Sequence, residues 1–273
     1  MTDDVTIRAL SSQHDYAACV ELQRDTWGRE FADTVPATIL MVSQRIGGVS
    51  AGAFDAAGRL LGFVFGMTGV ENGHVVHWSD MLAVRAEAQN LGIGRRLKEF
   101  QRSAVARVGG HVIYWTFDPL VARNAHLNFN VFGVRAVEYR RDMYGDDTGS
   151  QLHRGIGTDR LIVAWPVDDR DLAVRKRETA AARGGASWIE TPIVGDVDHP
   201  DHRWDHSIGE RPQLRIAVPL DISALQARDE SRAASWRSST RAAFESAFAK
   251  GYHVAGFTTD GDRERGYYLL DRH

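Results

Sequence analysis

The stretch that decides the fold is residues 77–108, which read HWSDMLAVRAEAQNLGIGRRLKEFQRSAVARV. Its first part, 77–84, has the length and apolar composition of a buried strand. Its last part, 93–108, places an apolar residue every three or four positions, which predicts an amphipathic helix. Between them, Gly92 and Gly94 leave backbone N–H groups uncovered at the positive end of a helix dipole, an arrangement that suits a phosphate group.

The spacing Gln-x-x-Gly-x-Gly at residues 89–94 resembles the acyl-CoA pyrophosphate loop of the GNAT superfamily of N-acyltransferases. The dinucleotide fingerprint Gly-x-Gly-x-x-Gly fits less well, because Leu97 stands at its third glycine and no acidic residue ends the next strand. No Gly-Lys-Ser/Thr follows, which excludes a P-loop. A tight turn that only lets a helix pack on a strand is the remaining alternative.

The composition of the whole chain narrows its class. The 273 residues include 43% hydrophobic and 25% charged residues, enough for an ordinary core. A net charge of −3 gives no basic excess for nucleic acid. The single cysteine, Cys19, and an N-terminus without a basic or apolar leader indicate a reducing, cytoplasmic location. No apolar run reaches the roughly 18 residues that span a bilayer, so we expect no membrane partner.

Hydrophobic periodicity and turn residues predict the order β-α-α-β-β-β-α-β-α-β, followed by one more strand. The predicted elements are 5–10, 16–27, 34–46, 49–55, 59–68, 77–84, 93–108, 111–117, 123–132, 134–139 and 161–167. Asp15 and Thr34 are the predicted helix caps, and Gly62 and Gly66 within a strand predict a bulge or a close neighbour. This order resembles the GNAT arrangement, which implies an α+β core with a mixed, mostly antiparallel sheet flanked by helices.

Residues 168–273 are predicted to form a C-terminal α+β extension packed on a core of residues 1–167. The predicted elements are helices at 170–182 and 221–250, the latter broken near 229–231, and strands at 215–219, 254–258 and 267–270, with a loop at 190–209. So few elements bury too little surface to be stable alone. The extension could close an acceptor cleft or form a homodimer interface, and the sequence does not choose between these.

The resemblance implies which residues hold acyl-CoA. In GNAT proteins, the strand before the loop separates from its neighbour, and its backbone binds the pantetheine arm. The matching residues are Met81, Leu82, Ala83 and Val84 for pantetheine, Gln89, Asn90, Leu91, Gly92, Ile93, Gly94 and Arg95 for the pyrophosphate, and Asn124 as a further contact. Leu82 and Val84 also fit a core strand, and both roles can hold because the contact uses the main chain.

A second motif, residues 115–133, resembles the GNAT strand-helix unit in which a tyrosine four residues before a glycine protonates the leaving thiolate. Phe129 occupies that position and cannot donate a proton, so the acid is another group or water. Tyr139 and Tyr144 are the nearest candidates by sequence.

The acceptor amine must also lose a proton before it attacks. The candidate bases are Asp118, His77, Asp80 and His126. Asp118 could instead orient Arg123, or cap the turn before Pro119.

The acceptor site is least defined. Arg237 and Arg241 lie one helical turn apart and precede Glu245, which predicts either a solvated ladder or a clamp for a substrate carboxylate. The pair Asp159-Arg160 could likewise be solvated or bind a substrate carboxylate. The Asp- and His-rich run 198–206 could hold a metal, but Pro200 breaks the regular face that ligands share, so we expect an exposed loop and no metal.

Residues 48–52 spell Gly-x-Ser-x-Gly, the esterase elbow, but a helix precedes them and a strand follows, which is the reverse of the order that the elbow needs. The sequence therefore predicts a cytoplasmic, CoA-dependent N-acyltransferase with acetyl-CoA as the default donor. The acceptor is a primary amine of a small molecule, such as an amino acid, and it attacks the thioester directly. The alternatives are a succinyl-CoA-dependent amino-acid N-succinyltransferase, a non-catalytic CoA-binding or regulatory module, and a nucleotide-binding protein.

Overall fold

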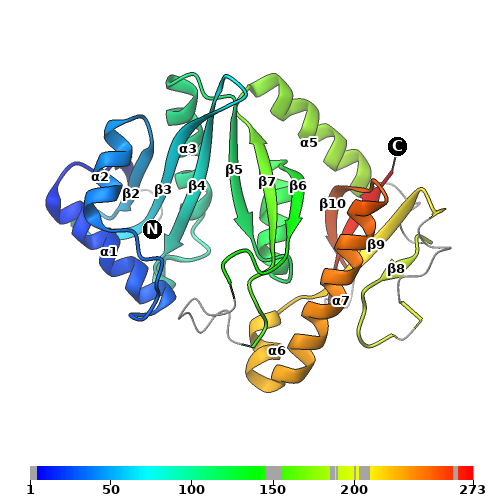
Figure 1. Cartoon of the computed structure of the whole chain (residues 1–273). Helices are drawn as coiled ribbons and strands as arrows, with labels where there is room; N and C mark the ends of the chain where they lie inside the picture. The colour runs from blue at the N-terminus through cyan, green and yellow to red at the C-terminus, as the bar shows by residue number, and fades with distance from the viewer. Residues whose placement is uncertain are drawn as a thin grey trace. The chain divides into compact units, whose positions relative to one another are not determined.

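The computed structural model describes residues 5–145, 155–184, 188, 190–199, 201–202, 210–260 and 264–272 (Figure 1). These residues form two compact units. Unit 1 holds residues 5–115 and 166–168, and unit 2 holds residues 116–145, 155–165 and the described residues from 169 onward. The sequence-based division into a core of 1–167 and an extension of 168–273 stays a prediction.

Unit 1 is built on a sheet in which β1 pairs with β2, β2 with β3 and β3 with β4, all antiparallel. A short parallel contact joins β4 to the start of β5. The strands are β1 (Thr6–Ala9), β2 (Val49–Phe54), β3 (Leu60–Glu71), β4 (His74–Val84) and β5 (Val112–Phe117), whose last two residues belong to unit 2. The strands predicted at 49–55 and 59–68 form the β2–β3 hairpin, and Gly58 in its turn has φ of +81°, as the turn requires.

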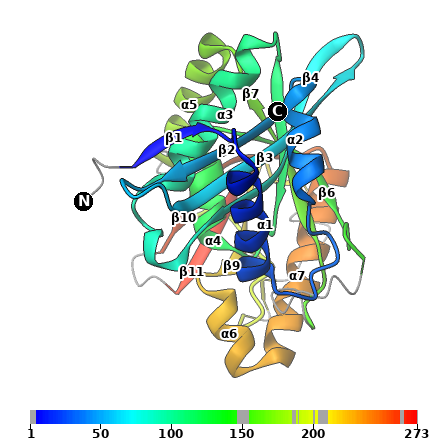
Figure 2. The same cartoon turned by 90° about the vertical axis from the view of Figure 1, so that its left-hand side faces the viewer.

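Helices cover both faces of this sheet: α1 and α2 lie in front of the strands in Figure 2, and α3 lies behind them. They are α1 (Gln13–Trp27), α2 (Ala37–Arg45) and α3 (Ile93–Arg107), with a 3₁₀ turn, η1 (Ala86–Ala88), before α3. On the front face, buried Tyr16, Cys19 and Leu22 of α1 pack against buried strand residues such as Phe63 and Met81. Cys19 is 0% exposed and therefore fills the core.

Two predicted helix caps are wrong. The side chain of Ser12, not Asp15, caps α1, because its oxygen accepts from the Asp15 N–H at 3.1 Å. The Asp15 carboxylate instead bonds Arg8 through two oxygens, at 2.6 and 3.1 Å. The second helix begins after Pro36 rather than at Thr34, since the fixed φ of proline suits a helix start.

The glycines inside β3 do mark a bulge, as predicted. Phe65 pairs with Met81 while Gly66 pairs with Ser79, so Asp80 of β4 is an extra residue between them. A Cβ atom on Gly66 would lie only 2.3 Å from the Nε2 atom of buried His77. Gly66 is therefore needed for the close approach of the two strands.

Unit 2 combines β6 and β7, which pair antiparallel, with a separate sheet in the order β10-β11-β9-β8. Its elements are α4 (Ala122–Ala125), η2 (His126–Phe132), β6 (Arg135–Arg140), β7 (Arg160–Pro166), α5 (Asp169–Gly184), β8 (Ile193–Val194), β9 (Gln213–Pro219), α6 (Ile222–Arg228), α7 (Glu230–Ala249), β10 (His253–Thr259) and β11 (Arg265–Asp271). Phe129, Phe244 and Phe257 surround Tyr268 edge-on, with ring centroids 5.0 to 5.9 Å apart, and form the aromatic core.

The elements of unit 2 agree with the sequence prediction in part. The helix predicted at 123–132 is one α-helical turn, α4, followed by the π-helix η2, and ends at Gly133 as predicted. The break near 229–231 is the junction of α6 and α7, where Asp229 caps α7. The short strand β8 lies in the segment predicted as loop.

The predicted fold class, α+β with a mostly antiparallel sheet flanked by helices and additional C-terminal elements, is confirmed. Among the described helices, none has the length and apolar character needed to cross a membrane.

Candidate functional site

The loop between β4 and α3 presents a row of free backbone N–H groups in unit 1. Gly92 caps α3 with φ of +73°, and Asn90 also has a positive φ of 63°. The first helical bond runs from the Arg96 N–H to the Gly92 carbonyl at 3.1 Å. The N–H groups of residues 90–95 bond to no other described residue. Four of these amides, from Gly92 to Arg95, are the uncapped helix donors, and such a cluster binds anions.

The strand that leads into this loop parts from its neighbour. Only residues 76–78 of β4 pair with β5, and β4 then continues to Val84. The Arg85 N–H bonds the Leu61 carbonyl at 2.8 Å, so by strand alternation the main-chain groups of Leu82 and Val84 point away from β3. Of these, the Val84 carbonyl accepts from Gln89 Nε2 at 3.2 Å. In unit 1 the other groups have no strand partner on that side.

The arginines of the loop are already engaged. Arg95 pairs with Glu99 at 2.8 Å on the exposed surface, and Arg96 donates to the Val5 carbonyl at 2.6 Å. An exposed i,i+4 pair contributes little stability, so Arg95 can leave Glu99 for a stronger anion. The residues of unit 1 predicted to bind CoA, 81–84 and 89–95, thus lie on one continuous segment that runs from the end of β4 to the start of α3.

His77, predicted as a catalytic candidate, is fully buried and has both ring nitrogens occupied. Thr68 donates its hydroxyl proton to the Gly47 carbonyl at 2.6 Å, so His77 Nδ1, 3.0 Å away, must donate to Thr68. The other ring nitrogen, Nε2, then accepts from Gln101 at 3.0 Å. Burial and the neighbouring Lys98 amine lower the pKa of His77 to about 4. No ring nitrogen remains for a substrate, and His77 does not enter the proposed mechanism.

This environment predicts a pH-dependent stability. Folded His77 protonates only near pH 4, whereas an unfolded histidine does so near 6.5, so the unfolded state binds more protons between these values. The free energy of unfolding should therefore fall by about 2 kcal/mol between pH 7.5 and 5. Urea titrations at both pH values should show a smaller fall for His77→Gln, and the wild-type fall for the exposed His253→Gln. Equal falls in all three proteins would contradict the prediction.

The extra residue in β4, Asp80, is a second titratable group beside the parting strands. Solvent reaches this residue, yet the protein around its carboxyl, with the Asp33 carboxylate nearby, raises its pKa. A carboxyl group with a raised pKa is better matched to proton transfer near neutral pH. Asp80 is therefore the best placed of the predicted bases in unit 1.

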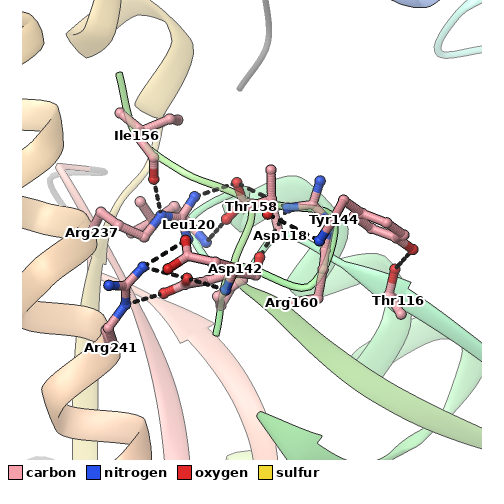
Figure 3. Close-up of polar contacts among 12 residues, drawn as sticks. Thr116, Asp118, Leu120, Asp142, Tyr144, Ile156, Thr158, Arg160, Arg237 and Arg241 are labelled. Atoms are coloured by element: carbon pink, nitrogen blue, oxygen red, sulfur yellow. Dashed lines mark hydrogen bonds and ion pairs between the residues drawn. The ribbon is translucent and has the colours of Figure 1, made fainter. Parts of the chain in front are cut away.

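In unit 2 the structure brings together several predicted site residues that are far apart in sequence (Figure 3). Arg237 of α7 donates from Nη2 to Asp118 at 2.5 Å and from Nε to the Ile156 carbonyl at 2.7 Å. The second oxygen of Asp118 accepts from the Leu120 N–H, which is the turn cap weighed before Pro119. Asp118 does not orient Arg123; its partners are Arg237 and, at 3.9 Å, Arg160.

Arg241 and Asp159 form the centre of the same network. Arg241 binds both oxygens of the fully buried Asp159, at 2.6 and 2.8 Å, and also Asp142 at 3.0 Å. Tyr139 donates to Asp159 at 2.5 Å. Burial opposes the charge of Asp159, but Arg241, Tyr139 and the Asp142 N–H outweigh it, so the pKa of Asp159 is lowered. Burial and this carboxylate raise the pKa of Tyr139, which disfavours its ionisation.

The solvent-exposed ladder considered for Arg237 and Arg241 is therefore wrong. Both side chains turn into unit 2 and bind its own carboxylates, while Glu245 is exposed. One group remains: Nη1 of Arg237 is buried and has no hydrogen-bond acceptor among the described residues. A buried unsatisfied donor is costly, which makes it a candidate contact for a bound polar group.

The remaining candidates in unit 2 differ in accessibility. Tyr144 is 39% exposed, and its hydroxyl lies 2.9 Å from that of Thr116. Asn124 is half-buried on α4, and its amide group bonds to no other described residue. Phe129 lies fully buried against Phe117 and Tyr268, so its position offers no proton donor.

The predicted absence of a metal site is not tested for the whole run 198–206, since residues 200 and 203–209 lie outside the described part. Within the described residues, no group of three His, Cys, Asp or Glu side chains could hold a metal ion. Asp198 binds Arg232 and Arg265 instead.

Sequence reasoning missed several residues that the structure places in these sites. In unit 2 these are Asp142, Thr158 and Ile156, whose roles depend on contacts to distant parts of the chain. In unit 1 the missed residue is Lys98, a buried lysine in α3. A lysine next to Leu97 on the apolar face of the predicted helix was the available signal.

No family model matches the chain, and no curated protein matches it. Solved structures of acetyltransferases do. One is the NatC complex bound to Gag peptide and CoA, with 13% identity, 60% of this chain and 98% of that chain covered, and a TM-score of 0.49. Another is a GNAT-family acetyltransferase from Desulfovibrio desulfuricans, with 17% identity, 60% and 99% covered, and a TM-score of 0.46. A third is an aminoglycoside 6'-N-acetyltransferase complexed with coenzyme A, with 17% identity, 60% and 98% covered, and a TM-score of 0.45. Each match has less than 20% identity and a TM-score below 0.5, so no activity or substrate follows from it.

Proposed function

We propose that this protein is a CoA-dependent N-acyltransferase that transfers an acyl group, by default acetyl, to a primary amine of a small molecule. The observation that carries the proposal is the row of unbonded N–H groups at residues 90–95, at the end of a strand whose main chain is open on one side. A diphosphate fits the amides, and an extended amide-bearing arm fits the open strand edge.

We assign the following binding roles to residues of unit 1. Gly92, Ile93, Gly94 and Arg95 bind the pyrophosphate through their N–H groups, and Gln89 fixes the end of β4 through the Val84 carbonyl. The open main chain around Leu82 holds the pantetheine arm, and a free N–H there can polarise the thioester carbonyl. The acceptor then attacks the carbonyl directly, so no covalent enzyme intermediate is needed.

The acceptor amine arrives as an ammonium and must be deprotonated. Asp80 is the proposed base, acting directly or through a water, because its raised pKa brings it closer to neutral pH. Arg237 and Arg241 bind carboxylates of unit 2 itself, so no side chain is assigned to the acceptor. Cytoplasmic location and the homodimer remain predictions from the sequence.

The first experiment asks which ligand stabilises the protein. We expect acetyl-CoA and CoA to raise the melting temperature, while NAD and ATP do not, because those ligands lack the pantetheine arm. Stabilisation by NAD or ATP alone would reject the acyltransferase. A thiol-release assay with acetyl-CoA and succinyl-CoA over a panel of primary amines then tests turnover. Binding without release for any donor would favour the non-catalytic CoA-binding module.

Replacing Asp80 by asparagine should lower kcat about 100-fold and leave the affinity for acetyl-CoA unchanged, because only proton transfer is lost. The pH profile of kcat/KM should lose its acidic limb in the variant. Asp33→Asn is the matched control: it removes a neighbouring carboxylate, so the limb should move to lower pH without a comparable loss of rate. An unchanged kcat in Asp80→Asn would remove Asp80 from the mechanism.

A further inference from the structure

Lys98 of α3 is a buried amine with no acidic partner. The residue is 4% exposed, and its Nζ donates to Ser79 Oγ at 2.7 Å. The same nitrogen lies 3.8 Å from the centre of the Trp115 ring. No Asp or Glu among the described residues pairs with it. Burial of a lysine without a counter-ion is rare, since the charged form is costly to desolvate.

The two residues that hold the amine mark the point where the strands part. Trp78 of β4 and Tyr114 of β5 are the last paired residues, and Ser79 and Trp115 directly follow them. The amine therefore lies at the closed end of the opening along β4. In the proposed function, the pantetheine arm runs along this opening, from the amides at 90–95 toward that closed end.

Among the described residues, the groups packed around Lys98 carry no negative charge. From β4 it faces Ser79 and His77, and His77 is uncharged because both its nitrogens take part in neutral hydrogen bonds. From α3 the neighbour is the uncharged Gln101, and from β5 it is Trp115. Burial lowers the pKa of Lys98 well below its ordinary value. A neutral amine can accept a proton, and it can be charged only when an anion comes beside it.

We propose that Lys98 is a catalytic residue that carries the proton from the attacking nitrogen to the leaving sulfur of the thioester. The inference rests on the proposed function, and it supplies the proton donor that Phe129 cannot be. Phe129 has no ionisable group and lies within the aromatic core of unit 2.

The proton balance defines the step. An acceptor ammonium loses two protons on becoming an amide, and Asp80 passes the first to solvent. When the neutral amine adds to the carbonyl, its nitrogen becomes positive, and Lys98 takes the second proton from it. The C–S bond then breaks, the electron pair stays on sulfur, and the Lys98 ammonium returns its proton to that sulfur. Lys98 is neutral again, and one thiol and one amide have formed.

The chain contains only three lysines, Lys98, Lys176 and Lys250, which makes a direct measurement simple. In protein labelled with ¹³C-lysine, the side-chain carbon next to each amine reports its titration. With CoA bound, the thiol can give its proton to Lys98 and form an ion pair. We expect the Lys98 midpoint to rise by about one pH unit or more with CoA, and not with desulfo-CoA. The signal of the exposed Lys176 should not respond to either ligand.

Variants test the role in turnover. Lys98→Met should lower kcat for acetyl transfer to hydroxylamine about 100-fold, with CoA affinity unchanged. Its melting temperature should be equal or higher, because a buried amine is replaced by an apolar chain of similar length. Lys98→Arg, which stays charged, should not restore the rate. Lys176→Met is the matched surface control and should behave as wild type.

The outcomes separate the two proposals. If CoA and desulfo-CoA both bind and Lys98 titrates identically with each, Lys98 is not the proton carrier, while the acyl-CoA site stands. If Lys98→Met keeps the wild-type kcat and pH profile, the inference is likewise overturned. If neither ligand binds, the proposed function fails first, and the role of Lys98 falls with it.

Discussion

Replacing Gly92 by valine should weaken the binding of CoA and acetyl-CoA about a thousand-fold while the protein remains folded. A diphosphate would receive several charge-assisted bonds from the amides at 90–95, each contributing about 1.5 to 3 kcal/mol. Gly92 has φ of +73°, a conformation that a β-branched residue rarely adopts, so valine would rotate these amides out of line. No atom lies within 4 Å of a Cβ at Gly92, so the new side chain meets no clash and the protein can remain folded.

The control for this variant is Gly73→Val in the β3–β4 turn. Gly73 has φ of +80° and also has open space around its Cβ position, so the backbone strain is matched. It lies at the opposite end of β4 from the loop. Isothermal titration with CoA should show wild-type affinity for Gly73→Val and a near-complete loss for Gly92→Val. Wild-type affinity in both variants would mean that the loop is only a turn.

Replacing Asp159 by asparagine should reduce the free energy of unfolding by about 3 to 4 kcal/mol. Asp159 is 0% exposed and accepts bonds from Arg241, Tyr139 and the Asp142 N–H. An amide in its place presents two N–H donors to a network that already consists of donors, and leaves the Arg241 charge only partly compensated. Urea unfolding of the full chain at pH 7 measures the loss.

Asp25→Asn is the matched control for charge removal. Asp25 pairs with Arg85 at 3.2 Å on the surface and is 53% exposed, so its loss should cost less than about 1 kcal/mol. The two variants should also differ in acid. Because the folded pKa of Asp159 is lowered, its contribution is present at neutral pH and is lost as the pH falls below about 4. Similar losses for both variants at pH 7 would show that the buried network is not stabilising.

The strand, loop and helix of unit 1 were predictable because their information is local. The apolar run predicts a strand that ends at Val84, and the three- or four-residue period predicts a helix from Ile93; β4 ends and α3 begins at these residues. The cap of α1 was mispredicted at Asp15 for a non-local reason: Arg8 occupies the Asp15 carboxylate, so the neighbouring Ser12 takes the cap.

The contacts of unit 2 could not be read from one sequence. Arg237 meets Asp118 across 119 positions, and Arg241 meets Asp159 across 82. A helical spacing shows that the two arginines share a face but not which surface the face meets. The π-helix η2 was also not predicted, because an apolar pattern over seven residues does not distinguish a π-helix from an α-helix.

The binding proposed for the cofactor uses main-chain N–H and carbonyl groups, and every residue except proline has both. Leu82 could become isoleucine or methionine, and Asn90 another residue that tolerates a positive φ, without altering those groups. Selection would then preserve a backbone path and two glycines rather than a string of side chains. Proteins that inherit such a backbone site can diverge until their sequences no longer reveal common ancestry, while they still bind the same cofactor through the same main-chain groups.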